Sequence, residues 1–229
     1  GQEFAIFLKG LQDTLNPAVT ADEAIEMLAQ HILTLPVFQA LFAGSDFPEN
    51  NAVAKALQAI VQKLDTAAVA SETEGLAKFY ENIRERISLA KSDKSKQDII
   101  RNLYDTFFNN SFPRMAARLG IVYTPTEVVD FILHSVQAAL SKHFNCNIGD
   151  KDVQLLDPFS GTGTFFVRLI QSGLISKEDL PHKYSHELHA NEIVLLAYYI
   201  ATVNIETAYH GQTGTYLPFT GMVLTDTFQ

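Results

Sequence analysis

Apolar residues recur at helical spacing through the first 120 residues. A capping-box pattern, Thr20-x-x-Glu23, precedes an apolar stripe formed by Ile25, Leu28, Ala29, Ile32 and Leu33. The same spacing predicts further helices near residues 3–15, 49–65, 74–91 and 96–110. Turn-forming residues predict breaks at Pro36, Gly44-Ser45-Asp46, Ser71 and Ser92-Asp93. Nothing in this half places a nucleophile beside a base, so we expect these helices to have a structural or coupling role.

The pattern changes after residue 120. Thr124-Pro125-x-Glu127 predicts a helix start, with Thr124 as N-cap, Pro125 at the first helical position and Glu127 completing a capping box. The apolar face of this helix is formed by Val128, Val129, Ile132, Leu133 and Val136. Strands are then predicted at residues 153–156, 184–190 and 222–225, and helices at residues 165–171, ended by Gly173, and 193–205. This order predicts a parallel sheet with helical crossovers.

The most informative segment is residues 155–165, which read Leu-Leu-Asp-Pro-Phe-Ser-Gly-Thr-Gly-Thr-Phe. An apolar strand ends on Asp157, and Gly161 and Gly163 follow just before a helix begins. The two glycines permit positive φ angles and a close approach of the backbone to a ligand. Asp157 would lie at the carboxyl end of its strand, where open α/β sheets bind ligands. Asn191-Glu192 and residues 225–228 lie at the ends of the next two predicted strands and fit the same ligand, S-adenosylmethionine.

Two other glycine-rich motifs fit this segment less well. A phosphate-binding P-loop requires a Gly-Lys pair, and none follows Gly163. The dinucleotide motif G-x-G-x-x-G would place its third glycine at Phe166, where a bulky ring obstructs close helix–sheet packing. Its acidic residue is expected about 20 positions on, whereas Glu192 comes 31 residues after Gly161. A nicotinamide-binding oxidoreductase therefore remains a weaker alternative.

Residues 157–165 resemble the D-P-x-x-G-[ST]-G-x-[FL] motif of amino-methylating DNA methyltransferases. The resemblance implies that Asp157 and the glycine loop hold the methionine part of S-adenosylmethionine, that Glu192 accepts bonds from both ribose hydroxyls and that Asp226 reads the adenine amino group. Thr124-Pro125 resembles an upstream motif that closes over the cofactor. The implied cofactor-binding residues are Thr124, Pro125, Asp157, Phe159, Gly161, Thr162, Gly163, Glu192, Asp226 and Thr227.

Each of these elements has an ordinary structural reading when taken alone. The loop reads as a structural turn, Glu192 as an acid at a helix start and Asp226 as a turn residue. Their order along the chain, each at a predicted strand end or helix start, favours one shared cofactor site.

The resemblance extends over most of the chain. Residues 123–132, 156–165, 189–206 and 224–229, behind a helical segment, are similar to the methyltransferase region of single-polypeptide (Type I-like, ISP) restriction–modification enzymes. The resemblance implies an α/β fold: residues 1–120 form a helical coupler-like domain, and residues 121–229 form an incomplete Rossmann-like S-adenosylmethionine-dependent methyltransferase sheet. It further implies adenine-N6 methylation of DNA, in the cytoplasm, by a polypeptide that also carries motor, nuclease and target-recognition domains.

The catalytic motif of that family, [ND]-P-P-[YF], is absent from residues 1–229. In the family, its polar side chain and proline carbonyl hold the target amino group of a base flipped out of the duplex. We therefore expect no catalytic residue in this segment and no methylation by it alone. A non-catalytic helical module that couples motor to methyltransferase is the alternative function.

Charge, cysteine and histidine content indicate which partners and sites to expect. The formal net charge is −9, and residues 121–229 hold 5 Lys and Arg against 11 Asp and Glu, so contacts with DNA are expected mainly in other regions. The single Cys146 excludes an internal disulfide and fits an intracellular setting. His186-Glu187-Leu188-His189 is one residue short of the zinc motif H-E-x-x-H, so no metal site is expected. No apolar run is long enough for a membrane span.

Overall fold

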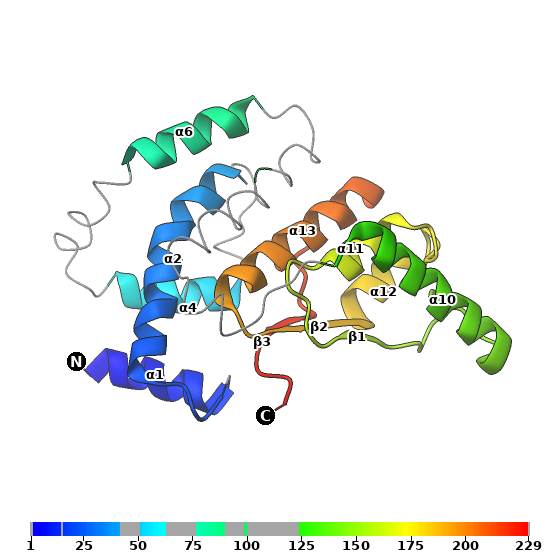
Figure 1. Cartoon of the computed structure of the whole chain (residues 1–229), viewed down its shortest axis with the longest axis horizontal. Coiled ribbons are helices and arrows are strands. Elements are labelled where there is room, and N and C mark those ends of the chain that lie inside the picture. Colours follow the sequence, from blue (N-terminus) through cyan, green and yellow to red (C-terminus); the bar gives the residue numbers. More distant parts are fainter. Residues whose placement is uncertain are drawn as a thin grey trace. The chain divides into compact units, whose positions relative to one another are not determined.

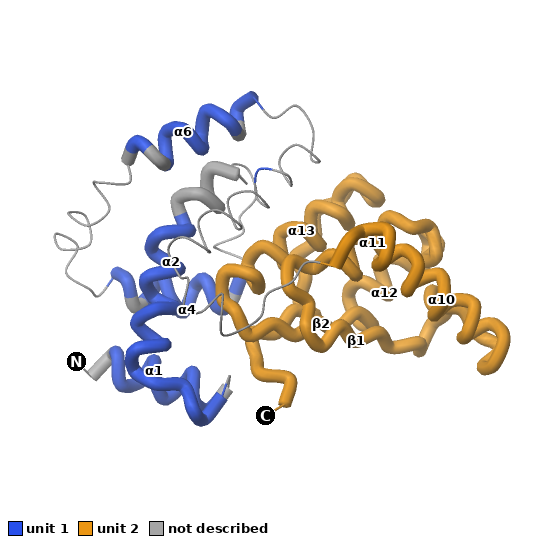
Figure 2. The backbone as a smooth tube through the Cα atoms, viewed as in Figure 1, with its two compact units in different colours: residues 1–114, 229 blue, residues 115–228 orange. Residues whose placement is uncertain are grey.

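The computed structural model describes residues 2–14, 16–41, 51–62, 77–89, 99 and 124–228. The chain divides into two compact units, Gly1–Arg114 together with Gln229, and Met115–Phe228 (Figure 2). The predicted boundary between residues 120 and 121 and most of the predicted helix at 96–110 lie outside the described residues. Each unit is described by itself below.

The described part of the first unit is helical, as the sequence predicts (Figure 1). Its helices are α1 (Gln2–Thr14), α2 (Ala21–Leu41), α4 (Ala52–Val61) and α6 (Ala77–Ser88). Helix α2 packs against the other three. Tyr80 on α6 donates its hydroxyl proton to the Leu33 carbonyl at 2.8 Å, and His31 contacts Gln58 on α4 at 3.3 Å. Burial lowers the pKa of His31, so its imidazole is held neutral in this packed layer.

The predicted capping box at the start of α2 is confirmed. The Glu23 amide donates to Thr20 Oγ1 at 3.3 Å, and the Thr20 amide donates to Glu23 Oε2 at 2.9 Å. Two details of the prediction are wrong. Helix α2 continues through Pro36 instead of breaking there, and Ile25 is 54% exposed because the buried face of the helix includes Ala24, Leu28 and His31 instead.

The second unit contains a three-stranded parallel sheet in the order β1-β2-β3, as predicted. The strands are β1 (Leu155–Asp157), β2 (Leu188–Glu192) and β3 (Met222–Leu224). Helices α10 (Thr126–Phe144), α11 (Thr164–Gln171), α12 (Leu180–His186) and α13 (Leu195–Thr213) complete the unit, and Figure 1 shows them on one side of the strands. This arrangement is the incomplete Rossmann-like sheet that the sequence predicts.

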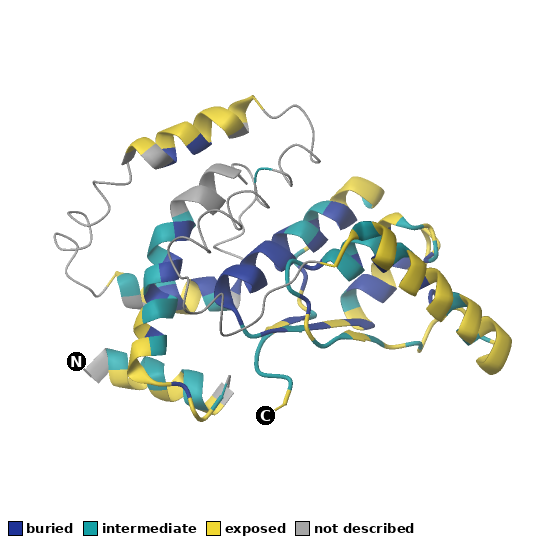
Figure 3. Ribbon diagram, in the orientation of Figure 1, coloured by how far each residue is buried: buried dark blue, intermediate teal, exposed yellow. Residues whose placement is uncertain are grey.

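The two faces of the sheet have different surroundings. Leu188, Ala190 and Met222 face the helices and are buried, whereas Leu156 and Val223 on the other face are 60% and 49% exposed. Helix α13 covers the buried face, and most of its length is itself buried (Figure 3). This burial explains its apolar character all round, which is typical of a core helix and not of a surface helix.

Two helix boundaries differ from the prediction. Helix α10 begins at Thr126 with Pro125 as N-cap and without a capping side chain, so the predicted Thr124–Glu127 capping box is wrong. Residues 184–186 belong to α12 and not to the second strand. A hydrogen bond from Ser176 Oγ to Asp179 (2.6 Å) and a proline in the first turn start this helix, and an ion pair between Lys183 and Glu187 extends across its end.

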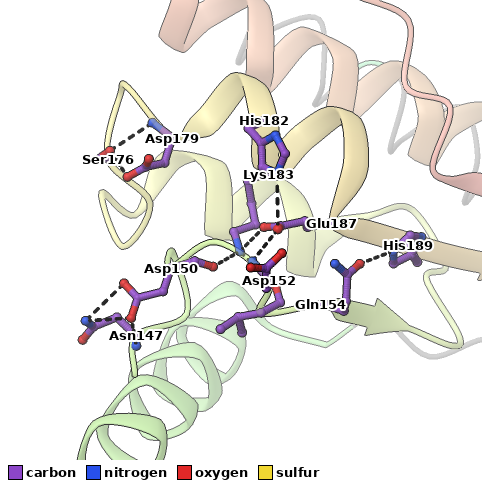
Figure 4. Close-up of polar contacts among 11 residues, drawn as sticks. Asn147, Asp150, Asp152, Gln154, Ser176, Asp179, His182, Lys183, Glu187 and His189 are labelled. Atoms are coloured by element: carbon purple, nitrogen blue, oxygen red, sulfur yellow. Dashed lines mark hydrogen bonds and ion pairs between the residues drawn. The ribbon is translucent and has the colours of Figure 1, made fainter. Parts of the chain in front are cut away.

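The Lys183–Glu187 ion pair fastens the amino ends of the strands (Figure 4). Both side chains are buried, with exposed fractions of 1% and 2%, and Nζ lies 2.5 Å from Oε2. Lys183 also donates to the carbonyls of Asp150 and Val153, and the Asp152 amide donates to Glu187 Oε1. Burial by itself would raise the pKa of Glu187, but the bonds from Lys183 and Asp152 more than offset it and hold the pKa below its ordinary value.

A second buried carboxyl fixes the segment between α13 and β3. Glu206 Oε1 accepts the Phe219 amide and Oε2 accepts the Tyr216 hydroxyl, both at 3.0 Å. Burial raises the pKa of Glu206 to about 6. Next to it, Gly221 packs so tightly that an added Cβ would lie 2.1 Å from the Leu188 carbonyl oxygen. These contacts set the position of β3 beside β2.

Replacing Lys183 with methionine should leave the Glu187 carboxylate buried without its cation. We expect Lys183→Met to lower the free energy of unfolding by about 3 kcal/mol, the usual cost of breaking a buried ion pair. Urea unfolding at neutral pH measures this change. Lys177→Met, at an exposed lysine of the same region, is the matched control, and a loss equal to that of the control would contradict the prediction. The double variant Lys183→Met/Glu187→Leu should recover most of the loss, because no buried charge remains.

Candidate functional site

The carboxyl ends of the three strands meet at one edge of the sheet. Strand β1 ends on Asp157 and β2 ends on Glu192, and the register pairs Asp157 with Ala190 and Glu192 with Leu224. The Thr225 amide, just beyond β3, donates to the Glu192 carbonyl at 2.9 Å. In open α/β sheets this edge is where ligands bind. The structure therefore brings the three predicted acidic positions to the same edge.

The glycine loop connects β1 to α11. Gly161 and Gly163 have φ angles of 54° and 79°, in the left-handed region that favours glycine. A Cβ at Gly163 would lie 3.1 Å from Ala201 Cα, so this glycine permits the close packing of α11 on α13. A Cβ at Gly161 would meet nothing within 4 Å. Gly163 therefore serves packing, whereas Gly161 leaves open space above the loop.

Asp157 carries a buried oxygen that has no hydrogen-bond partner among the described residues. Its Oδ1 accepts the Phe159 amide at 3.3 Å, but Oδ2 makes no hydrogen bond within the described structure. Burial raises the pKa of Asp157 above its ordinary value, although the Phe159 amide opposes this. An orphaned carboxylate oxygen of this kind is suited to a cationic donor such as an ammonium group.

Glu192 is 8% exposed and holds two segments together. Its Oε2 accepts the Gly161 amide at 2.8 Å, and its Oε1 accepts the Val194 amide at 2.7 Å. Burial raises the pKa of Glu192, and the nearby Asp157 carboxylate raises it further. Among the described residues, no lysine, arginine or histidine pairs with either carboxyl. Two carboxyls whose pKa values burial raises, and which have no counter-ion among the described residues, favour a positively charged ligand.

Helix α11 starts at this same edge. Gly163 is its N-cap, and no side chain caps its first-turn amides. Uncapped amides and the positive end of the helix dipole attract anionic groups. The edge thus offers acceptors for a cation at Asp157 and donors for an anion at α11, the pairing that an amino-acid zwitterion requires.

The segment after β3 is joined to the glycine loop. Thr227 Oγ1 donates to the Pro158 carbonyl at 2.6 Å and accepts from Asn191 Nδ2 at 3.3 Å. Asp226 Oδ1 accepts the Phe228 amide at 3.0 Å. The rings of Phe159 and Phe228 lie 5.5 Å apart, and these residues are 61% and 83% exposed. An exposed aromatic pair therefore borders the strand ends.

Thr124 and Pro125 occupy a different position from the other predicted residues. Both are exposed at the start of α10, where the Pro125 carbonyl accepts the amides of Val128 and Val129. An ion pair between Arg168 and Asp130, 2.7 Å between Nη2 and Oδ2, fastens α10 to α11. In the part of the chain that the structure describes, no hydrogen bond joins Thr124 or Pro125 to the glycine loop. Their role in covering a cofactor stays a prediction.

The sequence reading missed one contact to the loop. Asn204, in the middle of α13, donates from Nδ2 to the Thr162 carbonyl at 3.0 Å. In the sequence, Asn204 is marked only as a single amide side chain within a largely apolar helical stretch, residues 193–205.

The histidines near β2 contact polar and aromatic neighbours. His182 contacts Glu187 at 3.4 Å, its ring lies 5.0 Å from that of His186, and His189 contacts Gln154 at 2.7 Å. Nowhere in the described ranges do three His, Cys, Asp or Glu side chains gather closely enough to hold a metal ion.

Two protein families match successive parts of the chain. The family of the Type ISP restriction–modification enzyme coupler domain matches residues 1–95, and the N-6 DNA methylase family matches residues 95–215. The chain belongs to the N-6 DNA methylase family. The methylase match contains α10, the glycine loop, Glu192 and Asn204 and confirms the resemblance stated from the sequence. Membership of this family implies a methyl donor.

Three solved structures are similar to this chain, each with a TM-score of 0.89 and each matched over 99% of this chain. They are the ATP-dependent Type ISP restriction–modification enzyme LlaBIII bound to DNA (47% identity), a nuclease-deletion mutant of the Type ISP enzyme LlaGI in complex with a DNA substrate mimic (46%), and the DrdV–DNA complex (37%). The chain spans 16%, 19% and 22% of their respective lengths. No curated protein sequence matches it. No described helix combines the length and apolar character needed to cross a lipid bilayer.

The two glycines should respond differently to alanine. Both substitutions force a side chain into the left-handed region at about 1–2 kcal/mol, but only Gly163→Ala also pushes a Cβ against the Ala201 backbone. We expect Gly163→Ala to lower the free energy of unfolding clearly more than Gly161→Ala does. Urea unfolding of both variants measures the difference, with Gly161→Ala as the matched control. Equal losses would show that α11 and α13 are not packed through Gly163.

The raised pKa of Asp157 predicts a pH dependence of stability. The folded protein holds the Asp157 proton more tightly than the unfolded chain does. This contribution is therefore full below the ordinary carboxyl pKa and is lost as the pH rises through the folded-state value. Asp157→Asn should flatten the fall in stability that begins as the pH rises above about 4, the ordinary carboxyl pKa. Urea unfolding at a series of increasing pH values tests it, and Glu206 titrates equally in both proteins. A variant whose profile runs parallel to that of the parent would contradict the assignment.

Proposed function

We propose that residues 121–229 bind S-adenosylmethionine and form the cofactor-binding part of a DNA adenine-N6 methyltransferase. The observation that carries this proposal is the pair of carboxyls Asp157 and Glu192, which are buried beside the uncapped start of α11 and have no counter-ion among the described residues. S-adenosylmethionine carries an ammonium and a sulfonium charge together with a carboxylate, and its sulfonium methyl group is the one transferred. The match to the N-6 DNA methylase family supports the same reading.

Each predicted residue has a place in this proposal. Asp157 accepts the ammonium group through Oδ2, and the first-turn amides of α11 receive the carboxylate. The loop formed by Phe159, Gly161, Thr162 and Gly163 supplies the backbone surface against which the methionine part rests. No neighbouring atom would contact a Cβ at Gly161, which supports a close approach of the ligand there.

The nucleoside part of the ligand is bound by residues at the ends of β2 and β3. A carboxylate accepts about four hydrogen bonds. Glu192 accepts the amides of Gly161 and Val194, and its remaining acceptor capacity serves the ribose hydroxyls. Asp226 reads the adenine amino group, Thr227 keeps the segment after β3 against Pro158, and Thr124 and Pro125 cover the bound cofactor.

The transfer step itself belongs to the complete polypeptide. We propose that it is a cytoplasmic restriction–modification enzyme that methylates adenine-N6 in DNA and carries motor, nuclease and target-recognition domains. The three similar structures, each with DNA and each several times longer than this chain, support this assignment. The contribution of the residues described here is to bind and orient the donor, and orientation of reactants is a large part of catalysis in such transfers.

A second function is supported for the helical half. The match of residues 1–95 to the Type ISP coupler family favours a module that transmits contact between the motor and the methyltransferase. The two functions are compatible within one chain, because they reside in different units.

Ligand-dependent stabilisation tests the cofactor assignment. S-adenosylmethionine and its demethylated product, at 100 times the dissociation constant, should raise the free energy of unfolding by about 2.7 kcal/mol, whereas NADH and ATP should not. Asp157→Ala and Glu192→Gln should abolish the thermal shift. Glu178→Gln, at an exposed glutamate, is the control that should retain it. A shift with NADH alone would replace the proposal by a nicotinamide-binding site. A shift that survives in Glu192→Gln would remove this residue from the site.

A further inference from the structure

Asn204 lies beneath the glycine loop on the helix that packs against it. Its neighbours Val203 and Ile205 are buried in α13, and its Nδ2 donates to the Thr162 carbonyl at 3.0 Å. Thr162 stands between the two glycines with positive φ, Gly161 and Gly163. The amide of Asn204 therefore holds the one peptide carbonyl at the centre of the loop.

The same side chain carries an unpaired buried atom. Asn204 Oδ1 is shielded from solvent and has no hydrogen-bond partner within the described structure. The amide cannot be turned round, because Oδ1 would then face the Thr162 oxygen and two acceptors would oppose each other. An unsatisfied buried acceptor lowers stability. Folding alone would thus favour an apolar residue here, and the contact to Thr162 requires another explanation.

Three side chains hold the loop from three elements. Glu192 accepts the Gly161 amide at 2.8 Å, Thr227 donates to the Pro158 carbonyl at 2.6 Å, and Asn204 donates to the Thr162 carbonyl. The Thr162 carbonyl belongs to the same peptide as the Gly163 amide, which donates to the Ser160 carbonyl at 2.8 Å, so both polar groups of this peptide are held. The Thr162 amide, in the preceding peptide, donates to no group of the described structure. This amide adjoins the uncapped amides of α11 and is available to the anionic end of a ligand.

We propose that Asn204 is a positioning residue for the amino-acid part of the methyl donor. It fixes the peptide between Thr162 and Gly163, and with it the start of α11, so that the remaining amides of the loop and of the first helical turn face the donor's carboxylate before the ligand arrives. Preorganisation of this kind acts on affinity for the part of the ligand that touches the loop and leaves the remaining parts unaffected. The inference rests on the proposed cofactor site but concerns a residue outside its predicted contacts.

The test compares two ligands in three variants of the full chain. S-adenosylhomocysteine has the amino-acid part, whereas 5′-methylthioadenosine has the ribose and adenine without it. Asn204→Ala and Asn204→Leu should weaken S-adenosylhomocysteine at least about tenfold, with methylthioadenosine changed less than about twofold. Leucine is similar in size to asparagine and leaves no cavity at position 204. Weaker binding in Asn204→Leu would therefore not be explained by loss of packing. Thr202→Val removes a buried hydroxyl that bonds only within α13 and should change neither affinity.

Hydrogen exchange in the ligand-free protein separates this inference from the proposed function. The Gly163 amide donates to the Ser160 carbonyl at 2.8 Å, and its exchange should be about tenfold faster in both Asn204 variants but unchanged in Thr202→Val. Unaltered exchange overturns the role of Asn204 even if no ligand binds. Equal weakening of both ligands, with faster exchange throughout α13, overturns it in favour of a purely structural role. Absence of ligand binding in the parent chain with faster loop exchange would refute the cofactor assignment alone.

Discussion

The bidentate contact of Glu192 is the interaction on which the strand-end edge depends. One carboxylate, at the last residue of the central strand, accepts amides from the glycine loop and from the start of α13. It thereby sets the distance between the first and second βα turns. Without it, the Gly161 amide and the approach to α13 would each lose their partner at a buried position. The packing of Gly163 on Ala201 and the contact of Asn204 with Thr162 both follow from that placement.

The glutamates at the two ends of β2 have pKa values shifted in opposite directions by their surroundings. Glu187 precedes the strand and forms an ion pair with Lys183. This pair holds the pKa of Glu187 below its ordinary value and favours the ionised carboxylate. Glu192 ends the strand and is surrounded by amides and another carboxyl, so burial works against its charge. If both carboxyls served only the stability of the fold, each would be expected to have a cationic partner. The unpaired charge is concentrated at the edge where α/β sheets bind ligands, and this contrast supports a functional reading.

Sequence patterns predicted the fold well where local rules decide it. The parallel sheet, the Thr20–Glu23 capping box and the positive φ of Gly161 and Gly163 follow from periodicity and turn chemistry. Predictions failed where neighbouring elements decide. Pro36 is accommodated within α2, Ile25 is exposed because packing selects Ala24 and Leu28, and Tyr184 lies in a helix fastened by the Lys183–Glu187 pair. Asn204 was missed because its partner is 42 residues away in the sequence.

The raised pKa values of Asp157 and Glu192 have a consequence for calorimetry. Near the folded-state pKa values, part of the population of each carboxyl is protonated, and a cationic ligand selects the ionised form. Binding would then release protons to the solvent. The heat observed on titration would include the ionisation enthalpy of the buffer, multiplied by the number of protons released. Two buffers of equal pH and different ionisation enthalpy would therefore give two apparent binding enthalpies for one and the same association.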